Sequence, residues 1–448
     1  MKQNRTYAAN HNKITLGRKA ALKLLILGSY HTDGEIVRRA QKLGYYTIVT
    51  DSHQTDDLIP AKHFADEAWD ISWLDIDTLA EKCREAGVKG VIGGFSERRV
   101  ESMIRLCERL QLPCPITMAQ LDVTRDKLKF KQACRESGIP CVPEFKYGEE
   151  IRFPVIVKPV DRAGSIGINV AYNQADFERD YAYAMSLSET KQVIIEEYIN
   201  DGVKFDVYYY VQDGEIVFLG SSDTIMCKGK EGAEILQKAW PFPSKFEAQF
   251  LDEEDAHVRT MIRNLGIDNC YLTMSAFYRE GKFYFFEAGF RLSGELSFNY
   301  YEAISGIDYV DVIIRYALGE KESVRLEEVW KHHVHSVILN YFGRDGVVGS
   351  IEGVSEINAM PEVVDFLCFV APDEVIRNET RVFKKIAMCT ICADDCDRLR
   401  EVVRRVNGLL SIMDKDGKDM IYERLTEEEL GLIAGHQREG CGRDGGNT

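Results

Sequence analysis

The alternation of apolar and polar residues along the first quarter of the chain predicts strands separated by amphipathic helices. The runs that predict strands are 23–28, 46–50 and 90–93, and the stretches that predict helices are 35–43, 76–86 and 98–110. Strands and helices that alternate in this way build a parallel sheet covered by helices. The pattern therefore predicts a parallel α/β domain over residues 23–120.

The middle of the chain, residues 121–320, has a different pattern, in which strands are paired through tight turns. Gln-Asp-Gly joins the expected strands 205–211 and 215–219, and Arg-Glu-Gly joins 271–278 and 282–286. Turns of this composition connect the strands of β-hairpins. The other expected elements are helices at 124–138, 174–188 and 309–317 and strands at 155–157 and 193–196.

Fewer helices and strands are predicted for the two ends of the chain. Residues 325–425 are expected to form a small α+β domain with one helix at 397–407. Residues 1–22 are basic and lack a long apolar stretch, which predicts a flexible leader, with a targeting segment as the alternative. The polar residues 426–448 are expected to form a disordered tail.

The amino-acid composition and net charge of the chain disfavour some classes of binding partner. Asp and Glu outnumber Lys and Arg by 72 to 56, which gives a net charge of −16. Such a surface repels polyphosphate, so nucleic-acid and anionic-membrane partners are disfavoured. The twelve cysteines form no disulfide-like array. Several of them, such as Cys270 and Cys368, lie inside apolar strand-like runs, which suits free thiols in a reducing compartment. No apolar run approaches the roughly 18–20 residues that cross a bilayer, so a cytoplasmic protein is expected.

A lysine and a loop form the first candidate site. Lys158 ends the apolar strand 155–157, where its charge is costly unless it meets an anion. The loop Ala163–Gly167 follows closely, and backbone N–H groups of such a loop can wrap phosphates. Taken alone, this loop fits a plain surface turn equally well, and Lys127 upstream fits a solvated helix face. The loop residues that we select as candidates are Gly164, Ser165 and Gly167.

An acidic strand end forms the second candidate site. The strand that ends at Glu196 continues into Glu197, Tyr198 and Ile199. The Glu196 carboxylate can accept a hydrogen bond from an adenine amino group, and the three following backbone units can bond the purine edge. A strand edge with two solvated carboxylates is the alternative.

Glu287 and Arg291 form the third candidate site. A carboxylate at the end of an apolar hairpin needs a partner or a cation, and Mg²⁺ that bridges to a triphosphate is suitable. Arg291 can clamp an anionic substrate in a bidentate way. A structural Glu–Arg ion pair is the alternative.

The order and spacing of these sites resemble the ATP-grasp superfamily, in particular biotin carboxylase, carbamoyl phosphate synthase and the purine-pathway carboxylate–amine ligases. The resemblance runs from about residue 23 to residue 320 and includes Phe153-Pro-Val-Ile-Val-Lys-Pro159. It implies a multidomain protein of α/β and α+β class. A Rossmann-like domain precedes an ATP-grasp domain at 121–320, which contains a mobile lid at about 155–220, and a small C-terminal α+β domain follows.

The resemblance also implies how ATP is bound. Lys127, Lys158 and the loop at 163–167 contact the phosphates, and Glu196–Ile199 hold adenine. Asp206 lies where such proteins place a ribose or polar contact.

The implied reaction uses Glu287 as a Mg²⁺ ligand and Arg291 with Lys158 as catalytic groups. A small-molecule carboxylate attacks the γ-phosphate of ATP, and an amine or thiol then displaces phosphate from the acyl phosphate. Catalysis of this kind consists mostly of positioning and charge neutralisation. The resemblance makes a homodimer the expected assembly.

Two positions depart from the family pattern. Ser275, twelve residues before Glu287, stands where relatives carry a first metal-binding carboxylate, and Gly289 stands where they carry Asn. A hydroxyl is a poor replacement for a carboxylate on a hard cation. Two alternatives to the ligase therefore stay open: a nucleotide-binding protein with impaired catalysis, and a bicarbonate-activating carboxylase-type enzyme.

Three further patterns are interpreted as structural. Cys389, Cys392 and Cys396 lack a second CxxC or a histidine at ligand spacing, and His332–His335 lack a carboxylate or cysteine nearby in sequence. The charged stretch Asp223–Lys238 is expected to be a solvated loop, with a substrate-covering loop as the alternative.

Overall fold

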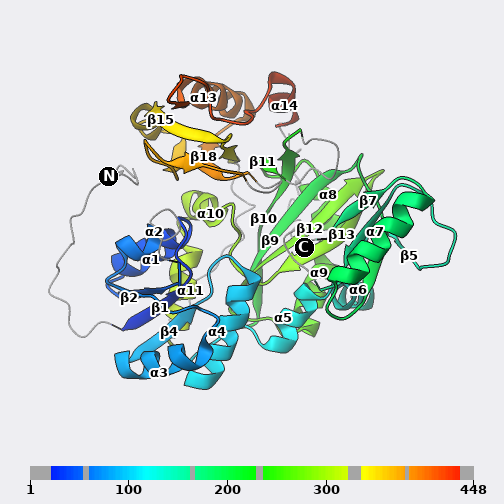
Figure 1. Cartoon of the computed structure of the whole chain (residues 1–448), viewed down its shortest axis with the longest axis horizontal. Coiled ribbons are helices and arrows are strands. Elements are labelled where there is room, and N and C mark those ends of the chain that lie inside the picture. The colour runs from blue at the N-terminus through cyan, green and yellow to red at the C-terminus, as the bar shows by residue number, and fades with distance from the viewer. Residues whose placement is uncertain are drawn as a thin grey trace, which may run out of the picture.

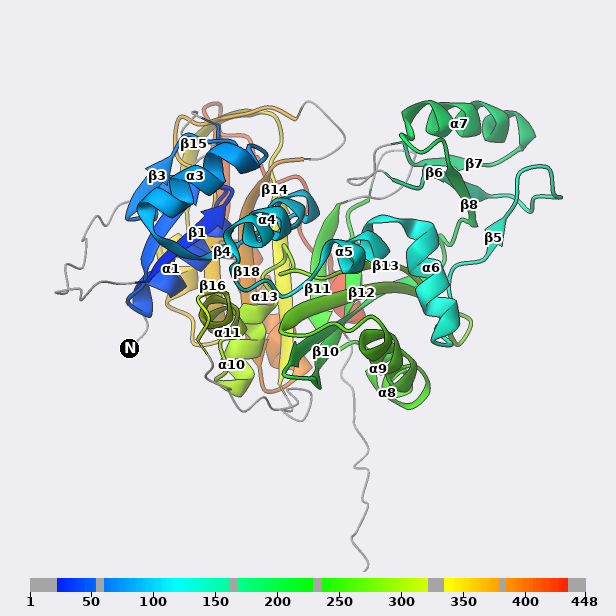
Figure 2. The same ribbon diagram turned by 90° about the horizontal axis from the view of Figure 1, so that it is seen from below.

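The computed structural model of the chain describes residues 22–53, 60–161, 167–228, 236–320, 334–378 and 383–433. Within these residues the strands form four sheets. The N-terminal domain and the C-terminal segment lie at one end of a large antiparallel sheet, and a small four-stranded subdomain projects at the other end (Figures 1 and 2). The predicted combination of a parallel α/β domain with antiparallel α+β structure is confirmed.

The N-terminal domain contains a parallel sheet in the order β3-β2-β1-β4. Its strands are β1 (Lys23–Leu27), β2 (Tyr46–Thr50), β3 (Glu67–Trp69) and β4 (Val88–Ile92). Its helices are α1 (Asp33–Lys42), α2 (Pro60–Phe64), α3 (Ile76–Ala86) and α4 (Glu97–Leu110). Helix α3 has the predicted bounds because Asp75 caps its first turn and Gly87 ends it with a φ of +72°.

Two helices connect this domain to the projecting subdomain. They are α5 (Met118–Arg125) and α6 (Lys127–Glu136), and together they replace the single helix predicted at 124–138. Asp126 divides them, because its extended backbone ends α5 while its side chain accepts hydrogen bonds from Leu128 N and Lys129 N at the start of α6.

The projecting subdomain has a sheet in the order β5-β8-β6-β7, with helix α7 packed on it (Figure 2). Its elements are β5 (Glu144–Phe145), β6 (Val155–Pro159), β7 (Asn169–Ala171), α7 (Gln174–Leu187) and β8 (Val193–Glu197). Val155, Val157 and Phe177 form part of its own small core. A separate core makes this subdomain a compact unit beside the central sheet.

The central sheet has eight antiparallel strands in the order β13-β12-β9-β10-β11-β14-β18-β16. Its first five strands in sequence are β9 (Val203–Gln212), β10 (Glu215–Met226), β11 (Gln237–Phe242), β12 (Cys270–Arg279) and β13 (Lys282–Gly289). Both predicted hairpins are present, since Asp213–Gly214 and Glu280–Gly281 all have positive φ, as two-residue hairpin turns of the favoured hand require. Helices α8 (Glu247–Glu253) and α9 (Asp255–Asn264) lie near the β12–β13 end (Figure 2).

The strands of the C-terminal segment continue this sheet beyond β11. They are β14 (His335–Phe342), β16 (Val363–Cys368) and β18 (Lys385–Ala393). A second sheet contains β17 (Val375–Ile376), β15 (Gly346–Glu352) and β19 (Ser411–Asp414), and the helices are α12 (Val354–Asn358), α13 (Cys396–Leu409) and α14 (Glu427–Leu432). Helix α13 extends the predicted 397–407 by one residue at its start and two at its end, and Asp395 caps it.

Two expectations about flanking segments are wrong. The polar tail expected from 426 begins with helix α14, which Thr426 and Glu429 stabilise through a capping box. Lys238, expected in a solvated loop, is instead a buried residue of β11. Its ammonium lies 2.8 Å from Glu429 and 3.0 Å from Glu423, so burial of this lysine fixes α14 against the sheet.

Helices α10 (Phe298–Ser305) and α11 (Tyr309–Ala317) return the chain to the N-terminal domain. Arg39 of α1 is buried and donates to Glu302, Asp308 and Asn299, so a charged network joins the two regions. Among the residues that the structure describes, no helix combines the length and apolar character needed to cross a bilayer.

Candidate active site

Two lysines approach each other where the projecting subdomain meets helix α6. Lys158 ends strand β6, as predicted, and is only 6 % exposed. Lys127 begins α6, and its Nζ donates to the carbonyl oxygen of Val160 at 3.2 Å, just beyond Lys158. Burial lowers the pKa of Lys127, and the positive charge of Lys158 lowers it further. Two cations held this close favour an anion between them.

A buried carboxylate neutralises part of this charge. Glu196 is 2 % exposed, Lys131 Nζ lies 2.6 Å from its Oε1, and Lys158 contacts its Oε2. Burial opposes ionisation of Glu196, but the two lysines outweigh it and hold its pKa below the usual value. Glu196 was predicted to accept from adenine, and the structure instead engages both its oxygens with lysines.

Lys131 was missed by the sequence analysis. It is 1 % exposed, and it also donates to the carbonyl oxygen of Val142 at 2.7 Å. The available signal was its position four residues after Lys127, which places both lysines on one face of α6.

The strand end expected to hold the purine is already partly hydrogen-bonded. Arg279 pairs with the Glu197 carboxylate at 2.7 Å, the Glu197 amide donates to Pro143, and the Tyr198 amide donates to Pro154. Within the described residues, the amide of Ile199 has no hydrogen-bond partner. It is therefore the backbone donor of this segment that remains available to a purine edge.

The predicted phosphate loop is described only at its end. Gly164 and Ser165 lie outside the described residues. Gly167 has a φ of +77°, and a Cβ there would come within 2.8 Å of Pro159 and 2.9 Å of Leu187. Gly167 is thus required by both backbone conformation and close packing at this point.

Glu287 and Arg291 lie at the end of β13, facing the start of helix α4. Burial raises the pKa of Glu97, the negative charge of Glu287 adds to this effect, and Arg291 and Lys127 oppose it. These four groups therefore share one electrostatic environment. Arg291 donates to the carbonyl oxygen of its neighbour Leu292 at 3.1 Å, while its buried Nε has no hydrogen-bond partner among the described residues.

Glu97 is a second residue that the sequence analysis missed. It follows strand β4 of the N-terminal domain and begins helix α4, whereas Glu287 and Arg291 come from the central sheet. The usable signal was its place just after a parallel strand, since ligands of such sheets bind outside the carboxyl ends of the strands.

The neighbouring part of the central sheet contains Asp206, Ser275 and Gly289. Asp206 is 3 % exposed and accepts hydrogen bonds from Ser275 Oγ and, at 2.8 Å, from Thr224 Oγ1. Gly289 contributes no side-chain ligand. Within the described part of the chain, no three His, Cys, Asp or Glu side chains gather in a metal-binding arrangement, which includes the cysteines at 389–396. His332 and His333 lie outside the described residues.

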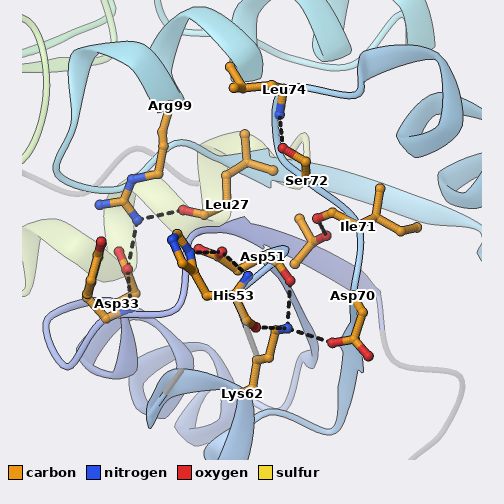
Figure 3. Close-up of polar contacts among 12 residues, drawn as sticks. Leu27, Asp33, Asp51, His53, Lys62, Asp70, Ile71, Ser72, Leu74 and Arg99 are labelled. Atoms are coloured by element: carbon orange, nitrogen blue, oxygen red, sulfur yellow. Dashed lines mark hydrogen bonds and ion pairs between the residues drawn. The ribbon is translucent and has the colours of Figure 1, made fainter. Parts of the chain in front are cut away.

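The carboxyl edge of the N-terminal sheet is filled by its own side chains (Figure 3). Arg99 donates to the carbonyl oxygen of Leu27 at 2.8 Å and to Asp33 at 2.7 Å. A Cβ at Gly28 would come within 1.7 Å of the Arg99 guanidinium. Arg99 therefore occupies the space beside Gly28 that the pyrophosphate of a dinucleotide would need.

A third group of charges lies where the N-terminal domain, the central sheet and the C-terminal segment meet. Lys385 of β18 donates to the carbonyl oxygen of Gly294 at 3.4 Å. Burial lowers the pKa of Lys385 to about 8, opposed by the nearby charge of Glu295. The ring of His31 in the N-terminal domain lies beside that of Phe369, with centroids 5.1 Å apart and the ring planes tilted by 39°. Phe369 in turn donates through its amide to Ile386, next to Lys385.

Two segments of the chain match known protein families. Residues 126–325 match the family described as carbamoyl-phosphate synthase L chain, ATP binding domain, and residues 339–413 match L-amino acid ligase C-terminal domain 2. Formate-dependent phosphoribosylglycinamide formyltransferase of Sulfurisphaera tokodaii is 25 % identical over 215 residues, which are 44 % of this chain and 53 % of that protein. The chain spans between 49 % and 64 % of the length of the first curated relatives that it matches.

Two solved structures share the fold over most of the chain. L-amino acid ligase from Bacillus licheniformis has a TM-score of 0.72 at 17 % identity and covers 89 % of this chain and 100 % of its own. The biotin carboxylase domain dimer of Hydrogenobacter thermophilus 2-oxoglutarate carboxylase, in complex with MgADP, ADP and bicarbonate, has a TM-score of 0.71 at 19 % identity. That match covers 92 % of this chain and 98 % of the other.

The match over residues 126–325, together with the shared fold, places the chain in a class of proteins that contain an ATP-binding domain. The ATP-binding region of the chain and its fold are those of the ATP-grasp superfamily. ATP with Mg²⁺ is the cofactor pair of this superfamily.

Proposed function

We propose that this protein is an ATP-dependent ligase that joins a small carboxylate to an amine or thiol through an acyl phosphate, releasing ADP and phosphate. The observation that carries the proposal is the shared environment of Lys127, Glu97, Glu287 and Arg291, in which groups from three segments converge. Cations for phosphates lie beside a carboxylate for Mg²⁺ and a guanidinium for the reacting acid. This is the set of charges that phosphoryl transfer to a carboxylate requires.

Each group has a defined part in the proposed reaction. Lys127 and Lys158 neutralise the phosphates, and the Ile199 amide bonds the purine. Glu287 would hold Mg²⁺ through a carboxylate oxygen, and the ion would supply charge stabilisation to the phosphates of the nucleotide. Arg291 orients the carboxylate for attack on the γ-phosphate, because a guanidinium binds carboxylate and phosphate in the same bidentate geometry.

The acceptor is proposed to enter from the side of Glu295, Lys385 and His31. Lys385 lies in the C-terminal segment, and among the described residues its ammonium contacts a carbonyl oxygen and a thioether but no carboxylate oxygen within ion-pair distance. A buried ammonium in such surroundings favours an anionic group on the incoming molecule. A homodimer, a small-molecule acceptor and a cytoplasmic location remain predictions.

The test is ATP turnover with Mg²⁺ against a pool of amino acids and small carboxylic acids. ADP and phosphate are measured together, and the Glu287→Gln protein is run in parallel. Release that depends on the pool and is lost in Glu287→Gln supports the ligase, and division of the pool then identifies the substrates. Release that depends on bicarbonate alone supports a carboxylase-type enzyme instead.

One result of this experiment would contradict the proposed ligase activity but not nucleotide binding. Tight ATP binding with no ADP release from any pool, with bicarbonate present or absent, is the behaviour of a nucleotide-binding protein that has lost turnover. Ser275 and Gly289 are the residues on which that alternative rests.

A further inference from the structure

Three side chains on neighbouring strands form one row across the floor of the candidate site. Ser275 of β12 is the direct register partner of Asp206 on β9 and of Glu287 on β13. Residues directly opposite one another in antiparallel pairs point to the same face of the sheet, so the three side chains share a face. The β12–β13 register shifts immediately after Ser275, and such irregularities re-aim side chains beside functional sites.

The Ser275 hydroxyl has a defined orientation in this row. Its Oγ donates its proton to Asp206 Oδ1, while the other oxygen of Asp206 faces Thr224 Oγ1 at 2.8 Å and Lys204 Nζ at 3.8 Å. A hydroxyl that has donated its one proton keeps its oxygen lone pairs for another partner. Asp206 is 3 % exposed, so its negative charge lies behind Ser275.

We propose that Ser275 Oγ is a direct ligand of Mg²⁺, next to the Glu287 carboxylate, and that Asp206 positions this hydroxyl and supplies the negative charge that position 275 lacks. The inference rests on the proposed function, since it takes Mg²⁺–nucleotide as the ligand of this face. Serine and threonine hydroxyls bind nucleotide-associated Mg²⁺ in P-loop proteins. Carboxylates behind metal ligands orient them and raise their basicity.

The geometry favours a role in which Asp206 acts on Mg²⁺ through Ser275 and does not bind the ion itself. Adjacent strands lie about 4.8 Å apart, which places the Cα atoms of Asp206 and Glu287 about 10 Å apart. Ser275 lies between them, and the burial of Asp206 leaves little room for a hydrated ion at its carboxylate. Mg²⁺ keeps several waters and takes phosphate oxygens, so one carboxylate and one hydroxyl from the protein are sufficient.

The departure from the family pattern at position 275 then has a physical explanation. The carboxylate missing at 275 is present one strand away, at Asp206, and the hydroxyl of Ser275 connects it to the ion. Glu287 and Asp206 contribute two carboxylates to this row, and carboxylate oxygens are suited to a divalent ion such as Mg²⁺.

The experiment measures binding of Mn²⁺, as a paramagnetic substitute for Mg²⁺, to the full-length protein in the presence of ADP by electron paramagnetic resonance. ADP binding in EDTA is measured by calorimetry on the same proteins. Ser275→Ala and Asp206→Asn should each weaken Mn²⁺ binding about 10–100-fold, the usual effect of losing a ligand or its orienting partner. Metal-free ADP binding should stay unchanged in Ser275→Ala.

Thr224→Val is the matched control. It removes a neutral hydrogen bond to the other oxygen of Asp206 and leaves Ser275 untouched, so Mn²⁺ affinity should change less than in either test variant. Ser275→Glu restores a carboxylate at this position and should recover Mn²⁺ affinity when combined with Asp206→Asn. Circular dichroism confirms that each variant is folded.

The outcomes separate this inference from the proposed function. Unchanged Mn²⁺ affinity in both Ser275→Ala and Asp206→Asn, with a loss in Glu287→Gln, would overturn the assignment of Ser275 and leave the nucleotide site intact. Absence of ADP binding to the unaltered protein, with or without metal, would overturn the proposed function and this inference with it.

Discussion

The candidate site has two ends, and they hold their charges in different ways. At the subdomain end, the buried Glu196 carboxylate has two lysine partners, Lys131 and Lys158, within ion-pair distance. At the sheet end, Glu97, Glu287 and Arg291 influence one another, but none of them has an ion pair within hydrogen-bond distance among the described residues. Paired charges hold structure together, whereas unpaired charges are available to a ligand.

Charges at the subdomain end, including that of the proposed phosphate ligand Lys158, therefore already have a partner in the protein, whereas those at the sheet end do not. Glu196 was predicted as an adenine contact and Lys158 as a phosphate contact, and the structure gives both a structural partner first. The cost of breaking this triad should therefore appear as lost stability, and changes at the sheet end should appear as lost ligand binding or turnover.

The largest expected effect is on stability at the subdomain end. Glu196→Gln removes the carboxylate and leaves two buried ammonium groups without it, which should cost about 3–5 kcal/mol of the free energy of unfolding. Denaturant unfolding of this variant and the unaltered protein measures the difference.

Glu97→Gln is the matched comparison at the sheet end. Burial already raises the pKa of Glu97, so the folded protein disfavours its charge, and a neutral amide should change stability by no more than about 1 kcal/mol. Equal losses from Glu196→Gln and Glu97→Gln would show that the two ends do not differ.

The next effect is on turnover. Arg291→Lys keeps the positive charge but loses the planar, bidentate guanidinium, so ATP turnover with an active substrate should fall about 100-fold without a matching loss of stability. Initial rates and an unfolding curve on the same variant test this. A variant with ordinary rates would remove Arg291 from the reaction.

The last predicted effect is a pH dependence of stability, and it concerns His31 at the junction of the N-terminal domain and the C-terminal segment. Burial, with the nearby charges of Lys384 and Arg38, lowers the pKa of His31 to about 4. A folded-state pKa below the unfolded value means that the stability is complete above about pH 6.5 and is lost as pH falls towards 4. Because His31 is partly solvated, the loss by about pH 5 should be about 1–2 kcal/mol.

His31→Gln should remove this dependence, which unfolding curves at about pH 7 and pH 5 measure. If His31→Gln loses as much stability between about pH 7 and pH 5 as the unaltered protein, His31 is not the cause of the pH dependence.

Much of the fold was predictable because local signals agreed with it. Helix 76–86 and helix 309–317 appear with the predicted bounds, and the two hairpins formed at the predicted Asp-Gly and Glu-Gly turns. These elements depend on caps and turns that lie within a few residues of sequence. Strand β11 and helix α14 were missed because they contact partners that are distant in sequence: β11 pairs with β14, and Lys238 of β11 pairs with Glu429 of α14.

The site was predictable only in part for the same reason. Lys158 and Glu287 were selected from their places at strand ends and Arg291 from its place just after Glu287, whereas Lys127 was selected through the family resemblance. The structure brings Lys127, Glu287 and Arg291 into one environment with Glu97. Glu97 comes from another domain, and no local pattern reveals which strand end it will face. The same holds for the contact between Ser275 and Asp206, which spans 69 residues.

The most direct test of the central claim follows an oxygen atom. A substrate from the active pool is labelled with ¹⁸O in its carboxylate, and the phosphate released with ADP is analysed by mass spectrometry. Attack of the carboxylate on the γ-phosphate predicts one ¹⁸O in each phosphate, because the acyl phosphate keeps the bridging oxygen with phosphorus when the nucleophile displaces it. Phosphate without the label would contradict carboxylate activation at the Arg291 end of the site.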